Sequence, residues 1–136
     1  MGCKTLTAFA VLSAAALTFA APTKYEAEDQ AGVAAADISA DDEGAKYVKP
    51  ADAAGMTFTV KAEETSVYDI TARVRIKIYD WITSKIVVNG VEAGSMLTTP
   101  RNCDSSYVIS ASAKMKVGEN TITVGNQAIG VDYITV

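Results

Sequence analysis

The sequence lacks histidine entirely, and only two of its 136 residues are cysteines. Without an imidazole, histidine-based catalytic triads, histidine zinc sites and imidazole acid–base chemistry are excluded. Cys3 lies in an N-terminal segment that we expect to be removed, which leaves Cys103 alone. No intrachain disulfide can then form, and self-association through Cys103 is the alternative to a simple thiol. A domain of this size without a disulfide needs a proper hydrophobic core and often a structural metal.

Charged residues are almost absent from the first twenty positions, where Lys4 stands alone before an apolar run from Leu6 to Phe19. Small residues at Thr18 and Ala20 fit a cleavage site. The run is short for a membrane span, so the pattern predicts a secretory signal peptide over residues 1–20. We therefore expect a secreted, extracellular protein with one domain, residues 21–136.

Positive charge is scarce in this expected domain. Without Lys4, 11 basic residues face 16 acidic residues, a net charge of −5. Nucleic acids and anionic membrane surfaces require a basic patch, so neither is an expected partner.

Alternating apolar and polar residues are the main structural signal. Residues 66–79 (SVYDITARVRIKIY) alternate throughout, which predicts a long strand with one buried face. Asn89-Gly90 lies between two apolar runs in residues 84–94 and predicts a β-hairpin. Further strands are expected at 56–60, 106–117, 121–124 and 130–136, with a turn at 118–120; the Ala-rich stretch 31–40 is ambiguous. Roughly eight short strands predict an all-β fold, an antiparallel β-sandwich of jelly-roll type.

Three acids crowd the segment TKYEAEDQ (23–30), namely Glu26, Glu28 and Asp29. We expect this segment to be extended, which would place Glu26 and Glu28 on the same face of a strand. Two explanations fit such a pair of like charges: an exposed edge strand on which water screens both carboxylates, or a shared cation.

Several short motifs occur in an order that resembles the carbohydrate-binding modules of families 6 and 35. They are YEAED (25–29), KYV (46–48), IVVNGVEAG (86–94), VGENTITV (117–124) and VDYITV (131–136). Modules of these families are jelly rolls found with secreted polysaccharide-degrading enzymes. The resemblance implies a structural calcium ion bound by Glu26, Glu28 and Asp132. Carboxylate oxygens are the ligands that calcium prefers.

The resemblance also implies a sugar site in the loops at one end of the sandwich. Tyr47 fits the first aromatic position and Asn126 fits the asparagine position. Family members tend to carry a tryptophan in the loop that corresponds to 98–108, where this sequence offers only Tyr107. Trp81 is either a displaced sugar platform or a cover of the core. Packing is the alternative role for Tyr47 and Tyr107, and a turn is the alternative for Asn126.

The basic row Arg73, Arg75 and Lys77 would lie on the outer face of the long strand, either paired with local acids or facing uronic acids. No spacing of carboxylates singles out a glycosidase pair, so we do not expect an enzyme. The leading interpretation is a secreted, non-catalytic module that attaches to a plant-type or other extracellular polysaccharide or oligosaccharide. The alternative is a structural or surface-assembly subunit that keeps the sandwich without binding sugar.

Overall fold

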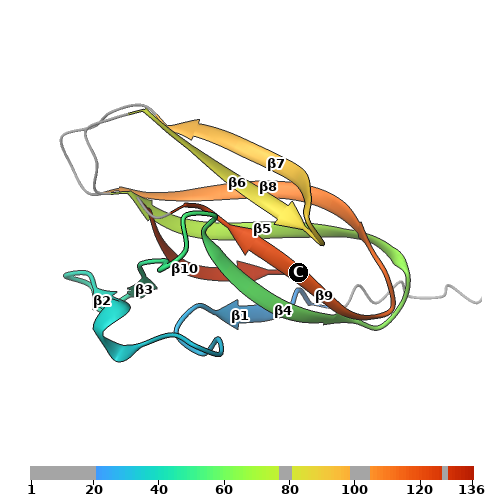
Figure 1. Ribbon diagram of the computed structural model, residues 1–136, viewed down its shortest axis with the longest axis horizontal. Coiled ribbons are helices and arrows are strands. Elements are labelled where there is room, and N and C mark those ends of the chain that lie inside the picture. Colours follow the sequence, from blue (N-terminus) through green and yellow to red (C-terminus); the bar gives the residue numbers. More distant parts are fainter. Residues whose placement is uncertain (1–20, 77–80, 99–104, 127–128) are drawn as a thin grey trace, which may run out of the picture.

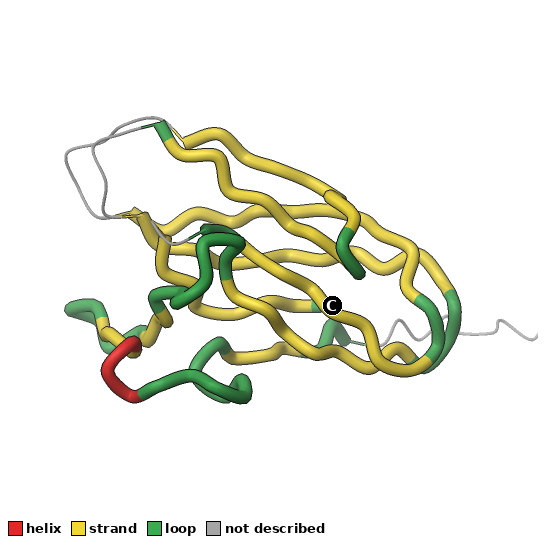
Figure 2. The backbone as a smooth tube through the Cα atoms, viewed as in Figure 1, coloured by secondary structure: helices red, strands yellow, loops and turns green. Residues whose placement is uncertain are grey.

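The computed structural model describes residues 21–76, 81–98, 105–126 and 129–136. The predicted signal peptide, Cys103 and Lys77 lie outside these ranges. Strands account for most of the described chain, and short loops connect them (Figure 2). Within the described residues, no helix is long and apolar enough to cross a membrane.

Two antiparallel sheets form a β-sandwich, as predicted (Figure 1). Sheet A has the strand order β2-β3-β10-β5-β8, with β1 also paired to β10, and sheet B has the order β4-β9-β6-β7. The described strands are β1 (Lys24–Glu26), β2 (Ile38–Ala40), β3 (Lys46–Val48), β4 (Met56–Ala62), β5 (Ser66–Ile76), β6 (Ile82–Val88), β7 (Val91–Thr98), β8 (Ser105–Met115), β9 (Gly118–Val124) and β10 (Ile129–Thr135). The ambiguous stretch 31–40 contains a short 3₁₀ turn, η1 (Ala35–Asp37), followed by β2.

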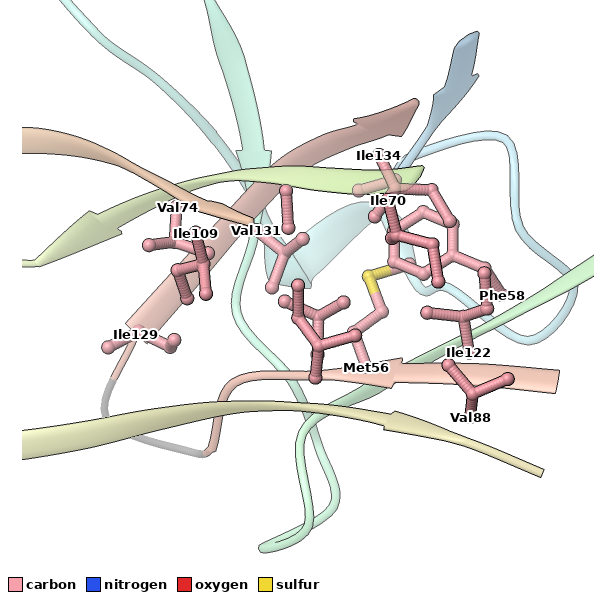
Figure 3. Close-up of a cluster of buried hydrophobic side chains, with 14 of the residues drawn as sticks. Met56, Phe58, Ile70, Val74, Val88, Ile109, Ile122, Ile129, Val131 and Ile134 are labelled. Atoms are coloured by element: carbon pink, nitrogen blue, oxygen red, sulfur yellow. The ribbon is translucent and has the colours of Figure 1, made fainter. Parts of the chain in front are cut away.

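The core forms between the inner faces of the two sheets, where apolar residues alternate along the strands. Every second residue of β4 is buried, and the same alternation runs along β5 from Ile70 to Ile76. Side chains from both sheets meet in Figure 3: Phe58 and Ile122 come from sheet B, and Ile70 and Ile134 come from sheet A. Burial of this apolar surface is the main favourable contribution to folding.

Strand β10 is unusual because two short strands share one of its edges. Its other edge pairs with β5 along most of its length. On the shared edge, Val131 pairs with Val48 of β3, and Tyr133 to Thr135 pair with β1. The register of β10 against β5 shifts between Val131 and Tyr133, a β-bulge at Asp132. The bulge therefore lies where the partner of β10 changes from β3 to β1.

The predicted Asn89-Gly90 hairpin joins β6 and β7, and both residues have positive φ angles, 49° and 83°. These angles are those of the primed turn that matches the strand twist. The predicted turn at 118–120 is misplaced, because β9 already begins at Gly118, whose φ is 97°. The chain reverses just before Gly118, and Asn120 is the third residue of the strand.

Asn120 fastens this reversal to the β6–β7 hairpin. Its side chain is 2% exposed. Its amide donates to the carbonyl oxygens of Lys116 and Gly118, at 2.8 and 3.0 Å. Its oxygen accepts from the Lys116 backbone N–H at 3.2 Å and from the Asn89 amide at 2.9 Å. Both functional groups of this buried amide are therefore satisfied, as burial requires.

Asn120→Ala should lower the free energy of unfolding by about 1–3 kcal/mol, because it removes four hydrogen bonds and leaves partly buried groups without these partners. Urea unfolding followed by circular dichroism measures the change. Thr59→Ala, at an exposed position of the neighbouring strand, is the control and should change stability by less than about 1 kcal/mol. Equal midpoints for Asn120→Ala and the wild type would show that the network does not hold the hairpin.

Candidate functional site

The predicted metal residues lie beside the bulge in β10. Glu26 ends β1 and is paired in register with Tyr133. Ala27 is fully buried, and its N–H donates to the carbonyl oxygen of Asp132 at 2.9 Å, which extends the pairing with β10 by one residue.

The backbone then turns, and the Gln30 N–H donates to the carbonyl oxygen of Ala27 at 3.2 Å. Glu28 lies in this turn and not in a strand. The expected extended segment is confirmed only over Lys24–Glu26. The expectation that Glu26 and Glu28 share one strand face is wrong, because Glu28 lies in the turn.

Each of the three acids contacts a different basic side chain. The Lys24 ammonium lies 2.5 Å from a carboxylate oxygen of Glu26, and that of Lys46 lies 3.8 Å from Glu28. The Arg73 Nε lies 3.5 Å from a carboxylate oxygen of Asp132. Within the described chain, no three acidic or cysteine side chains are arranged to hold a metal ion.

Two observations describe how a cation would affect these acids. The second oxygen of Glu28, Oε2, is buried and has no hydrogen-bond partner among the described residues. Burial raises the pKa of Asp132; the Arg73 charge opposes this rise, and the nearby charges of Glu26 and Glu28 add to it. A divalent cation would give the Glu28 Oε2 a partner and would offset the repulsion between Asp132 and the two glutamates. A calcium ion would need these carboxylates to leave their basic partners and converge, because no three of the described acids are arranged to hold an ion as they lie here.

Tyr47 lies on the outer face of sheet A, because its neighbour Val48 points into the core. The Tyr47 ring packs against Gly130, where a Cβ atom would lie 2.4 Å from the ring carbon Cδ2. The Arg75 guanidinium carbon lies over the ring, 5.1 Å from its centroid. The ring thus has protein contacts at Gly130 and Arg75, which favours the packing role for Tyr47.

Arg75 also holds the loop between β2 and β3. Its Nη1 lies 2.6 Å from a carboxylate oxygen of Asp41, and both side chains are mostly buried. The backbone N–H of Ala45 and, beside it, Arg75 hold the pKa of Asp41 below its usual value. The expectation that the basic row pairs with local acids is confirmed for Arg73 and Arg75.

A cleft of about 230 Å³ lies on this outer face. Its lining is charged or polar: Asp41, Asp42, Glu43, Arg73, Arg75 and Ser106. Among the described residues, no aromatic side chain lines this cleft, and Tyr47 lines the small pocket that adjoins it. The cleft itself therefore offers mainly hydrogen bonds and charges to a ligand.

Trp81 and Asn126 lie near the start of β6, in the other sheet. Trp81 is 60% exposed, directly before the inward-pointing Ile82. The Asn126 amide donates to the carbonyl oxygen of Thr83 at 3.2 Å. Leu97, also 60% exposed, is the cross-strand partner of Thr83. Thr83 thus binds the Asn126 amide through its carbonyl oxygen and pairs with the exposed Leu97, and the exposed Trp81 lies two positions before it.

Tyr107 occupies a different environment from Trp81. It pairs in register with the inward-pointing Val74 and packs, partly buried, against the core. The structure thus divides the predicted sugar residues: Tyr107 joins the core, Tyr47 lies on sheet A, and Trp81 and Asn126 lie near β6 of sheet B. The ion-pair partners Lys24 of Glu26, Lys46 of Glu28 and Asp41 of Arg75 were not predicted from the sequence. Residue spacing gives no signal for them, because the folded chain brings them together.

No family model matches the sequence, and no curated protein matches it significantly. Solved structures do resemble its fold. The native structure of a family 35 carbohydrate binding module from Clostridium thermocellum is 20% identical, with a TM-score of 0.62 over 85% of this chain and 97% of that one. The module CsCBM6-3 from Clostridium stercorarium, in complex with cellobiose, is 17% identical, with a TM-score of 0.55 over 82% of this chain and 90% of that one.

A longer protein is also similar, the GH26-CBM35 β-(1,4)-mannanase of Podospora anserina. It is 25% identical, with a TM-score of 0.59 over 84% of this chain and 27% of that one. The chain therefore spans about a quarter of the length of the mannanase. The fold of the present chain is that of the carbohydrate-binding modules of families 6 and 35.

Replacing the two exposed-face aromatics should affect stability differently. Tyr47→Ala removes the ring between Gly130 and Arg75 and should cost about 1–2 kcal/mol, whereas Trp81→Ala, at a mostly exposed position, should cost less than about 0.5 kcal/mol. Urea unfolding followed by circular dichroism tests both variants. A large loss of stability in Trp81→Ala would mean that Trp81 covers the core.

Proposed function

We propose that this chain is a secreted, non-catalytic module that binds an extracellular polysaccharide. The observation that carries the proposal is the fold, which matches two carbohydrate-binding modules over nearly their whole lengths. Secretion is supported by the apolar leader in residues 1–20. One of the similar modules is in complex with cellobiose, and the longer similar protein is a mannanase, so we propose a neutral β-linked polysaccharide as the ligand class.

Trp81 and Asn126 are the sugar contacts that the geometry supports best. The apolar face of a pyranose, with its C–H groups, packs against a flat aromatic ring, and nearby amides bind its hydroxyls. Trp81 exposes more than half of its surface, and Asn126 lies beside the same strand. Tyr47, next to the polar cleft, and Tyr107 are secondary candidates because packing engages both.

Affinity electrophoresis of residues 21–136 through gels containing mannan, β-glucan, xylan or pectin tests this proposal. At least one neutral polysaccharide should retard the wild type. Trp81→Ala should weaken binding about tenfold or more, the loss typical of a central aromatic contact. Val67→Ala, an equally exposed apolar position on β5, is the control and should bind normally.

Migration of the wild type without retardation in every gel would contradict sugar binding. The interpretation as a structural or surface-assembly subunit would then replace it. Retardation that Trp81→Ala leaves unchanged would instead move the sugar site away from Trp81.

We further propose that the module holds a structural calcium ion at Glu26, Glu28 and Asp132. Calcium takes roughly 6–8 oxygen ligands and often mixes carboxylates with carbonyls. The buried, unpartnered Oε2 of Glu28 and the pairing of β1 with β10 support the proposal. A cation at this position would join the first and last strands.

Calcium should raise the melting temperature of the protein. For a dissociation constant of about 10⁻⁴ M, within the range of extracellular modules, roughly 10 mM calcium adds about 2.7 kcal/mol. For a domain of this size the corresponding shift is on the order of 10 °C. Differential scanning calorimetry in calcium and in chelator measures it.

Glu28→Gln should lose most of this shift, because it removes one carboxylate from the site. Glu119→Gln, which removes an exposed carboxylate on β9, should retain it. Identical melting temperatures for the wild type with and without calcium would contradict the metal proposal.

A further inference from the structure

A further cleft, the loop cleft, lies between the segment that precedes β2 and the segment that follows β3. Residues 30–33 and 37 line one wall, and residues 48–52 and 55–57 line the other. The first wall ends in η1, the red segment of Figure 2. The volume of about 230 Å³ is below the roughly 300–1,000 Å³ of pockets that hold drug-sized ligands, so the loop cleft admits only a small ligand.

The most buried part of the lining is aliphatic. Val48 and Met56 are 2% and 6% exposed. Pro50 is also buried, and Val33 packs, partly buried, against the core. Because core packing already fixes these side chains, a ligand that contacts them loses little binding free energy to ordering them. This part of the loop cleft suits the C–H face of a small ring.

The more exposed part of the lining is polar, and its side chains are Gln30, Asp37, Lys49, Asp52 and Thr57. Carboxylate, amide, ammonium and hydroxyl groups can all form hydrogen bonds with the hydroxyls of a ligand. The two acids, Asp37 and Asp52, outnumber the one base, Lys49, so this lining disfavours an anionic ligand. An aliphatic floor with a polar rim therefore suits a neutral ligand that carries many hydroxyl groups.

Hydrogen bonds hold the first wall in place. The Gln30 amide donates to the carbonyl oxygen of Glu26 at 3.0 Å. The backbone N–H of Lys49 donates to the carbonyl oxygen of Asp37 at 2.9 Å, which ties the two walls together. These last contacts use backbone groups only. Among the described residues, the Asp37 carboxylate and the Lys49 ammonium have no hydrogen-bond or ion-pair partner, so both groups are available to a ligand.

The second wall contains a turn that requires glycine. The Asp52 carboxylate accepts from the backbone N–H of Ala54 at 2.8 Å, and the Asp52 carbonyl oxygen accepts from the N–H of Gly55 at 3.0 Å. The φ angle of Gly55 is 111°, and a Cβ atom at this position would collide with the carbonyl oxygen of Val124. The turn thus packs closely against the end of β9, and both walls are held before any ligand binds.

We propose that the loop cleft is a second sugar-binding site, which takes one ring of a neutral saccharide independently of Trp81. The inference takes its ligand class from the proposed function and adds a separate site. The C–H face of the ring packs on Val48 and Met56, and its hydroxyls bind Asp37 and Lys49. A cleft of this size fits a chain end or a side branch. Two sites would let one module hold two parts of a polysaccharide at once, which raises its avidity.

NMR of the backbone amides of residues 21–136, titrated with mannobiose and with cellobiose, tests the second site. The Gly32 and Gly55 amides should shift with at least one disaccharide, because both glycines line the loop cleft. Asp37→Ala should weaken the binding that these two amides report about three- to tenfold, the loss expected for about one hydrogen bond. Trp81→Ala should leave that binding unchanged.

Two further variants keep the test independent of folding. Lys49→Ala changes an exposed side chain, so it should fold normally and weaken binding at the loop cleft about two- to fivefold. Glu63→Ala removes an exposed carboxylate just beyond the other end of β4 and should leave the titration unchanged. Circular dichroism checks that every variant is folded.

The outcomes separate the second site from the proposed function. Amide shifts confined to the surroundings of Trp81, and abolished by Trp81→Ala, would overturn the second site and leave the proposed function standing. Shifts at Gly32 and Gly55 that neither Asp37→Ala nor Lys49→Ala weakens would also overturn the second site. If neither disaccharide shifts any amide, the second site is overturned, and retardation of the wild type in polysaccharide gels decides the proposed function by itself.

Discussion

The pairing of both chain ends through β10 is the constraint on which the rest of the structure depends. One edge of β10 pairs with β5, and the other is divided between β3 and β1 at the bulge of Asp132. This division brings the turn that holds Glu28 next to Asp132, and it places Gly130 under the Tyr47 ring. The acid cluster and the packed tyrosine therefore follow from one strand and its bulge.

The outer faces of the two sheets carry different chemistry as a result. On sheet A, Arg73 and Arg75 pair with acids, and the neighbouring cleft is lined by charged and polar groups. Near the start of β6 in sheet B, Trp81 is exposed, and the Asn126 amide binds the carbonyl oxygen of Thr83. A charged side chain is stabilised by a group of opposite charge. A sugar that stacks needs an exposed aromatic face instead, so the two functions need different surroundings. The proposed metal and sugar functions thus occupy separate parts of the sandwich.

Local patterns predicted those features that depend on near neighbours in the sequence. The alternation in β4 and β5 predicted which residues are buried, and Asn89-Gly90 predicted the hairpin with its positive φ angles. The turn expected at 118–120 was misplaced because Asn120, a common turn residue, instead binds the preceding reversal from within β9. An asparagine that acts in a turn and one that caps it from a strand look alike in a sequence.

The sequence by itself determined the fold class and the kinds of chemical group that its side chains offer, since alternation and composition act through local geometry and burial. Here no histidine and a single expected mature cysteine limited the chemistry from the outset. Only the tertiary structure decided which charges meet. Lys46 and Glu28 are eighteen positions apart, and Arg73 and Asp132 are fifty-nine apart, so only the folded chain brings them together. Electrostatic interactions depend on distance in space, and that distance is fixed by the pairing of β1, β3 and β5 with β10.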